Sequence, residues 1–213
     1  MKKLFAATLL VALTGCQSAY YSAMEQVGVH KRDILVDRVE ETRDAQGEAQ
    51  EEFRDALEQY RAVVQFDGGE LDQLYERLQA EYDDSYDAAE RVSDRIRSVE
   101  SVAEALFEEW DEELLQYQSD RLRVQSARQL RDTKARYQSL IATMKQAEKR
   151  MQPVLLALND NVLYLKHNLN AQAVGALKGE FANIRQNIDR LMRDMQRSIR
   201  ESDAFIASMD TKR

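Results

Sequence analysis

Cys16 is the residue whose chemistry follows most directly from this sequence, because it is the one cysteine among 213 residues. It follows Met1, two lysines and a mostly apolar run over residues 4–13. A short cationic stretch, a brief apolar stretch and small residues before the cut are typical of a cleavable export signal. The apolar run is too short to cross a bilayer, which takes about 20 apolar residues in a helix. Residues 1–15 are therefore predicted to be a signal peptide.

The last four residues of this segment, Leu13-Thr14-Gly15-Cys16, resemble the bacterial lipobox. In that motif a small residue precedes a cysteine whose thiolate takes a diacylglyceryl group, and this cysteine then becomes the first residue of the mature chain. The alternative is a reduced cysteine packed in a helix as a small hydrophobe. The place of Cys16 at the end of an export signal favours acylation, with cleavage between Gly15 and Cys16. By resemblance to lipoprotein sorting, Gln17 rather than aspartate indicates the outer membrane.

An acylated Cys16 suits a permanent membrane anchor. Each buried methylene contributes about 0.8 kcal/mol, so one acyl chain such as palmitate binds marginally and several bind firmly. The expected location is the cell envelope, on the periplasmic face of the outer membrane, with residues 16–30 as a lipidated tether. A chain with one cysteine forms no internal disulfide, so packing alone must stabilise its fold.

The charge of the chain argues against nucleic acid as a partner. The chain has 30 basic and 38 acidic residues, a net charge of -8. Loss of residues 1–15 removes Lys2 and Lys3, which leaves 28 basic and 38 acidic residues and a mature net charge of -10. Affinity for phosphate backbones needs cationic surface. The same charge repels anionic lipid headgroups, so the acyl chains are expected to provide the attachment to the membrane.

The composition is typical of long helices, with one proline, seven glycines, 32% charged and 44% apolar residues. In four stretches apolar residues recur at alternating steps of four and three, which is the pattern of a coiled-coil seam. Helices are predicted at about 31–65, 70–117, 120–168 and 171–209. Short loops between long helices place the neighbours antiparallel. The predicted fold class is all-α, with long antiparallel helices forming an elongated coiled coil or four-helix bundle over residues 31–213.

The four predicted seams differ in quality. The clearest runs from Leu71 to Trp110 and has Ser85 as its one polar member, whereas Thr42 and Gln46 weaken the seam before it. A single rod that joins the second and third helices is the alternative to a boundary capped by Ser119. The third seam is expected to hold Leu130, Lys134, Tyr137, Ile141, Met144, Glu148, Met151, Leu155, Leu158, Val162, Leu165 and Leu169.

Two features of the third helix leave alternatives open. Pro153 keeps the phase of the seam, which predicts a kinked helix, although a break is the usual alternative. The stretch from Val154 to Leu165 is apolar on every side, which predicts the buried centre of the bundle. A surface for a partner or for self-association is the second interpretation of that stretch.

Patterns that predict catalysis or metal binding are missing from the sequence. His30 and His167 lie far apart without a second His or Cys at ligand spacing, whereas zinc takes three or four such ligands. Carboxylate runs such as 111–113 are expected to be solvated and to bind calcium weakly at most. Gly175 and Gly179 lack the Lys-Ser/Thr ending of a phosphate loop and are expected to let their helix approach a neighbour closely. We therefore expect no enzyme, no cofactor, no metal site and no small-molecule substrate.

Three stretches carry a family resemblance: KRDILVDRV at 31–39, FDGG at 66–69 and LKHNLNA at 165–171. Over nearly all residues after Cys16 the chain resembles the DUF2959 family of gammaproteobacterial lipoproteins. The resemblance implies an uncharacterised lipoprotein and brings no activity, substrate or functional residue with it.

The expected function is that of a non-enzymatic cell-envelope lipoprotein, an elongated helical scaffold that holds a protein partner or self-associates. The alternative is a periplasmic stress-related chaperone or ligand-binding regulator with an adaptable, methionine-rich apolar surface. The methionines that could supply this surface are Met144, Met151, Met192 and Met195. Their burial would remove the reason for the alternative, whereas an exposed apolar patch would favour it.

Overall fold

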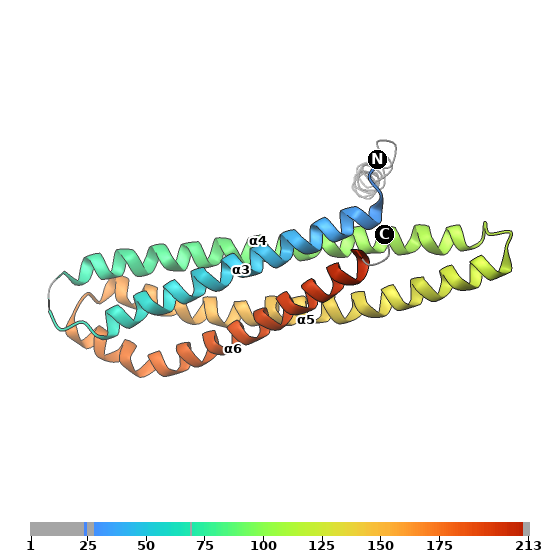
Figure 1. Ribbon diagram of the computed structural model, residues 1–213. Helices are drawn as coiled ribbons and strands as arrows, with labels where there is room; N and C mark the ends of the chain where they lie inside the picture. The colour runs from blue at the N-terminus through green and yellow to red at the C-terminus, as the bar shows by residue number, and fades with distance from the viewer. Residues whose placement is uncertain (1–23, 25–27, 69, 211–213) are drawn as a thin grey trace, which may run out of the picture.

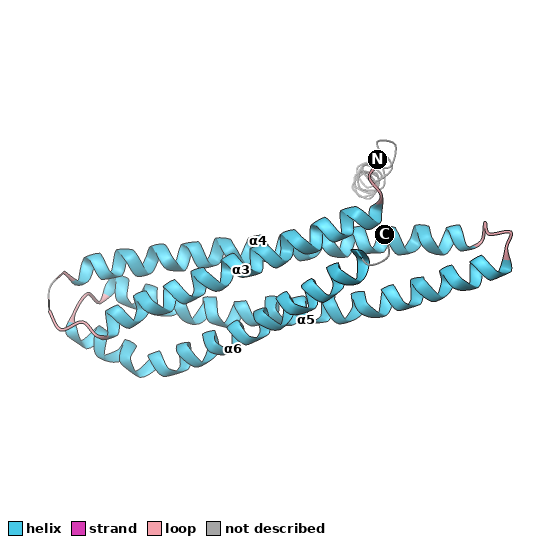
Figure 2. Ribbon diagram, viewed as in Figure 1, coloured by secondary structure: helices cyan, strands magenta, loops and turns pink. Residues whose placement is uncertain are grey.

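The computed structural model describes residue 24, residues 28–68 and residues 70–210. Over these ranges the chain forms four long helices, and no strand occurs in them (Figure 2). The helices are α3 (Lys31–Val64), α4 (Leu71–Leu114), α5 (Asp120–His167) and α6 (Ala171–Asp210). They lie side by side in one elongated bundle (Figure 1). The all-α fold class is confirmed, and each helix ends within a few residues of the expected position.

Each helix of the bundle packs against two others. Successive helices run antiparallel, and contacts also join α3 to α6, so the order around the bundle is α3, α4, α5, α6. The connections at 65–70 and 168–170 lie together at one end, and the connection at 115–119 lies at the other (Figure 1). The apolar seams of all four helices therefore meet in one central core.

Polar side chains set two of the helix starts. The Oγ of Ser119 accepts a hydrogen bond from the backbone amide of Leu122 at 3.4 Å, so α5 starts at Asp120. The alternative of one rod through this boundary is wrong. The Oδ1 of Asn170 accepts from two first-turn amides of α6 at 3.0 and 3.1 Å. Between α3 and α4, Gly68 has a φ of +145°, which favours glycine.

Helix α5 continues through Pro153, so the alternative of a break at this residue is wrong. A proline inside a helix removes the amide that would bond the carbonyl four residues earlier, at Lys149. Both residues are exposed, so water can reach this side of α5 and satisfy the carbonyl.

The seam of α5 differs from the predicted one at alternate positions. Thr133 and Ala147 are buried, whereas Lys134 and Glu148, which were expected in the seam, are only partly buried. Steps of four and three fit two adjacent ridges of one helix equally well, and the ridge with the smaller, less charged side chains faces the core. Lys134 instead reaches out from the side of the helix to Asp111, with Nζ and Oδ2 2.6 Å apart.

The stretch from Val154 to Leu165 is buried along one side only. Its inward residues include Leu158, which is 1% exposed. On the outward side, Leu156 is 62% exposed and Leu163 is 47% exposed. The expectation that the whole stretch lies at the centre of the bundle is wrong, because a helix with two neighbours still turns one face to solvent.

A buried, hydrogen-bonded tyrosine contacts three helices near the end of the bundle that holds the connections at 65–70 and 168–170, which we call the loop end. The hydroxyl of Tyr60 on α3 lies 2.9 Å from Oδ1 of Asn161 on α5 and 3.0 Å from the carbonyl of Leu177 on α6. Its ring stacks on Phe181 at a centroid distance of 5.9 Å. Burial raises the pKa of Tyr60 well above its ordinary value, so the hydroxyl stays protonated and can donate.

Polar residues also enter the core between α3 and α6. Thr42, Gln46, Ser198 and Ser202 are fully buried. The hydroxyls of Thr42 and Ser202 donate to backbone carbonyls one turn earlier. The side-chain amide of Gln46 has no hydrogen-bond partner among the described residues. An unsatisfied buried amide is destabilising, so the weak seam expected at Gln46 is a weak point of the core.

Gly175 and Gly179 face solvent on α6. A Cβ atom added at either position would meet nothing within 4 Å. The expectation that these glycines permit a close helix contact is therefore wrong. Within the helices that the structure describes, none combines the length and hydropathy that a bilayer-spanning segment requires.

Candidate functional site

The predicted lipidation and cleavage residues, Cys16 and Gly15, lie outside the described residues. The structure does show the end of the bundle at which α3 begins. Lys31 pairs with Glu109 of α4, with Nζ and Oε1 2.8 Å apart. Arg32 donates to the backbone carbonyl of Met209 in α6. The first turn of α3 is therefore fixed beside the end of α6 and beside α4.

At this same end, α4 and α5 continue past α3 and α6 as a hairpin that we call the arm, residues 107–132 (Figure 1). Its base is a hollow whose walls include Arg32 of α3, Thr133 of α5 and Met209 of α6. Thr133 lies thirteen residue steps along α5 from the helix start at Asp120. At 1.5 Å per residue, the arm projects about 20 Å beyond that level.

Aromatic and polar contacts between α4 and α5 hold the base of the arm, where it joins the body at Lys134 and Tyr137. Phe107 packs edge-on against Tyr137 at a centroid distance of 5.4 Å, and Nζ of Lys134 lies 5.6 Å from the centre of the Phe107 ring. Nε1 of Trp110 donates to Oγ of Ser126 at 2.8 Å. Burial, helped by nearby acidic residues, raises the pKa of Tyr137 to about 12. The base of the arm is thus ordered and partly dry.

The end of the arm exposes large apolar side chains, which we call the arm tip: Leu115, Tyr117, Leu122 and Val124. Their exposed fractions are 86%, 39%, 49% and 65% respectively. Sequence reasoning missed this surface because it extended the second helix to residue 117 and did not follow side chains outside the seams. The available signal was that three aliphatic residues lie off both seams within a short stretch.

The arm tip adjoins a basic stretch of an acidic chain. Residues 115–131 contain a single acidic residue, Asp120, and four arginines, so their net charge is +3 in a chain of net charge -8. The arginines are Arg121, Arg123, Arg128 and Arg131. The acidic run on α4 ends at Glu113, before the tip. Positive charge and exposed apolar surface therefore occur together at this end.

The hollow at the base of the arm is small. Its volume is about 250 Å³, and Leu106, Trp110 and Met209 form its apolar wall. Trp110, expected to pack in the core, is only partly buried and takes part in this wall. Sites for small molecules usually measure about 300–1,000 Å³, so the hollow is below the usual size.

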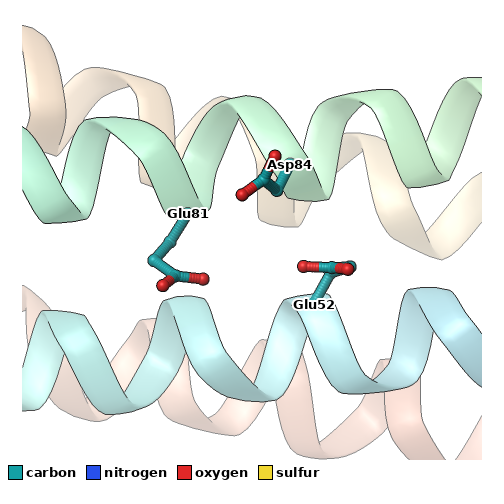
Figure 3. Close-up of side chains that lie close together, drawn as sticks. All are labelled: Glu52, Glu81 and Asp84. Carbon is teal, nitrogen blue, oxygen red and sulfur yellow. The ribbon is translucent and has the colours of Figure 1, made fainter.

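Three carboxylates meet between α3 and α4, where Glu52 faces Glu81 and Asp84 (Figure 3). One oxygen from each lies within 4.8 Å of the others. Partial burial, reinforced by the negative charges of Asp55 and Asp84, raises the pKa values of Glu52 and Glu81. Three such oxygens could serve a hard divalent cation, although calcium takes six to eight ligands. Water would have to complete the set.

The sequence did not predict this carboxylate group. Glu81 and Asp84 share a face of α4 because they are three residues apart. The meeting with Glu52 depends on how α3 and α4 align, and no single-helix pattern contains that alignment. Exposed acidic groups also occur without any ion, and the geometry alone selects none.

The two histidines lie at opposite ends of the bundle. His30 occupies the N-cap position of α3 without a side-chain cap bond, and His167 is the last residue of α5. Both are exposed. The structure therefore does not bring them together.

Comparison with known proteins places the chain in a family. A family model described as "Protein of unknown function (DUF2959)" matches residues 20–209. Neither the curated proteins nor the solved structures give a match. Because the match covers most of the chain, the chain belongs to this family.

Proposed function

We propose that this member of the DUF2959 family is a non-enzymatic lipoprotein of the cell envelope, anchored in the outer membrane by an acylated Cys16 and facing the periplasm. The observation that carries the proposal is the position of the one cysteine at the end of an export signal. The helical domain then serves as an elongated scaffold that holds a protein partner at a distance from the membrane.

The dimensions of the helices support a scaffold. Helix α5 has 48 residues, which corresponds to about 70 Å at 1.5 Å per residue. The core extends through the bundle as one cluster that includes residues from all four helices. A long body with a continuous core is stiff, so it can hold its two ends at a fixed separation.

A candidate partner surface lies on the outward side of α5, towards the loop end. We call it the α5 ridge: Leu156, Leu163, Tyr164 and the neighbouring Leu169. Their exposed fractions are 62%, 47%, 42% and 40%. Leu156 and Leu163 are seven residues apart, so they lie on one face of the helix. Such a face suits helix-on-helix contact with a protein partner or a second copy.

The alternative of a chaperone with a methionine-rich surface loses its support. Met144, Met151 and Met195 are at most 1% exposed, and Met192 is partly buried against the core. Methionines that fill a core cannot adapt to a client protein.

The anchor is tested by comparing the chain with its Cys16→Ser variant in cells of a bacterium that acylates lipoproteins. We expect the parent chain to take up labelled palmitate and to float with outer membranes. The variant should take up none and leave the outer-membrane fraction. Equal flotation of both chains, without label, would exclude the proposal.

The partner surface is tested by crosslinking from position 156 or 163 in the same cells. A matched exposed position on α3, the helix diagonally opposite α5, such as Arg54, serves as the control. A protein or second copy captured from the α5 ridge and not from the control supports the scaffold.

A further inference from the structure

We propose that the arm tip inserts into the headgroup region of the leaflet that holds the acyl chains of Cys16. The chain would then contact the bilayer at two points, the acyl anchor and the four apolar side chains of the tip. This inference rests on the proposed function, because the anchor brings the arm to the membrane.

The arm projects from the end of the bundle at which the tether joins α3. Met24 and Val29 pack against the core, and the amide of Val29 donates to the carbonyl of Met24 at 3.0 Å. Eight peptide steps separate Cys16 from Met24, and a fully extended chain of that length spans at most about 28 Å. The arm extends about 20 Å beyond the level of Thr133. The tether is therefore long enough to place the leaflet at the arm tip while α3 remains packed against Glu109 and Met209.

The chemistry of the arm tip matches a lipid interface. Leu115, Leu122 and Val124 offer aliphatic groups to the boundary of the acyl chains. Tyr117 has an apolar ring and a polar hydroxyl, which is why tyrosine is enriched at membrane interfaces. These residues cap the projecting end of a hairpin, where a flat bilayer can reach them together.

The charge of the arm tip matches the same surface. Arg121 and Arg123 flank Leu122 directly, and the Arg123 guanidinium lies 2.7 Å from Oδ1 of Asp120. Anionic headgroups attract arginine within about a Debye length.

A protein partner or a second copy fits the arm tip less well. The side chains lie on a projecting end and not in a groove, so a protein would have to supply the whole concave surface.

The test uses tryptophan as a depth probe in the acylated full chain, reconstituted in vesicles of phosphatidylethanolamine with phosphatidylglycerol as the minor component. The lipids are brominated on their acyl chains and quench tryptophan on contact. The probe variant is Tyr117→Trp, and the matched control is Tyr164→Trp on the α5 ridge. The parent tyrosines are similarly exposed, at 39% and 42%. Both variants keep Trp110 as a common background.

We expect brominated lipid to quench Tyr117→Trp and to leave Tyr164→Trp at the level of the parent chain. Adding Leu115→Gln and Leu122→Gln to the probe variant should weaken the insertion of the tip. The apparent partition coefficient obtained from quenching should fall about tenfold, which corresponds to about 1.4 kcal/mol. Circular dichroism of the triple variant shows whether the helices persist.

Each contrary outcome has a distinct meaning. If the chain is acylated and floats with the vesicles but Tyr117→Trp is not quenched, the inference is wrong and the anchor stands. If Tyr117→Trp emission changes with protein concentration in vesicles without bromine, the tip contacts a second copy, and the inference is again wrong. If the N-terminal peptide lacks acyl groups, the proposed function fails, and the same quenching assay on the unacylated chain still decides whether the tip inserts.

Discussion

The body of the bundle and its arm share the helices α4 and α5, yet the two regions bury apolar residues to different extents. In the body, where four helices meet, Phe53, Tyr60 and Leu165 are fully buried. In the arm, where α4 and α5 have only each other, Leu130 is 3% exposed while Leu115 is 86% exposed. A pair of helices can bury one stripe each. Apolar residues off that stripe remain available for contacts outside the chain. The body also exposes the α5 ridge, but only the apolar residues of the arm lie at a projecting end.

The largest expected contrast comes from truncating one phenylalanine in each region. Phe53→Ala should lower the free energy of unfolding by about 3–5 kcal/mol, because it leaves a cavity among four helices. Phe107→Ala at the base of the arm should cost about 1–2 kcal/mol, because Phe107 only borders the core and solvent can fill the space. Denaturant unfolding of the mature chain with Cys16→Ser measures both. Equal losses would mean that Phe107 is packed as tightly as Phe53.

A smaller contrast is expected for two tyrosine hydroxyls. Tyr60→Phe should lower the free energy of unfolding by about 1–3 kcal/mol, since Asn161 and the Leu177 carbonyl lose a buried donor. Tyr117→Phe at the arm tip should change it by less than about 0.5 kcal/mol. The same unfolding assay compares them. A costly change at Tyr117 would show that the tip belongs to the folded core.

Replacing the polar core residue Gln46 should change the free energy of unfolding in the opposite direction. Gln46→Met removes an amide without a partner and keeps a similar side-chain volume, so we expect a gain of about 1 kcal/mol in the free energy of unfolding. Gln116→Met, next to the exposed Leu115, is the matched control and should gain nothing. A loss of stability on Gln46→Met would mean that the amide has a partner in solution, such as an internal water.

The smallest effect is expected at the carboxylate group. The ordinary pKa of Glu52 is 4.5, and folding raises it, so the folded chain holds more protons than the unfolded chain just above that pH. The contribution of Glu52 to the free energy of unfolding therefore increases as the pH falls from neutral towards 4.5. Glu52→Gln should make that pH dependence shallower, whereas Glu58→Gln on the exposed side of α3 should not. Unfolding curves at a series of pH values give the free energy of unfolding as a function of pH. If Glu52→Gln and the parent chain have the same pH dependence, the carboxylates do not repel one another.

The two regions also differ in how far the sequence predicted them. The four helices and the buried face of α4 followed from the spacing of apolar residues, because a stripe at that spacing must face a core. The cap at Ser119 and the continuity through Pro153 concern local chemistry and were also expected. The prediction of Lys134 in the seam was wrong, and Thr133 is buried there instead. Adjacent ridges of one helix give nearly the same pattern of apolar residues.

Features that depend on helix alignment were beyond the sequence pattern. The arm exists because α4 and α5 pair further than α3 and α6 extend, and the meeting of Glu52 with Glu81 needs the register of one hairpin. The exposure of Gly175 and the outward turn of Leu156 depend on which face of each helix the neighbours cover. A single-helix pattern contains none of these distances. The chemistry of Cys16, in contrast, can be read only from the sequence.

The covalent state of Cys16 matters most, because the proposed orientation of the tether, the arm and the scaffold relative to the membrane follows from it. Mass spectrometry of the N-terminal peptide of the chain isolated from cells measures that state directly. We expect the peptide to begin at Cys16 and to carry the mass of a diacylglyceryl group with a further acyl chain. A peptide that begins at Met1 with an unmodified thiol at Cys16 would contradict the account.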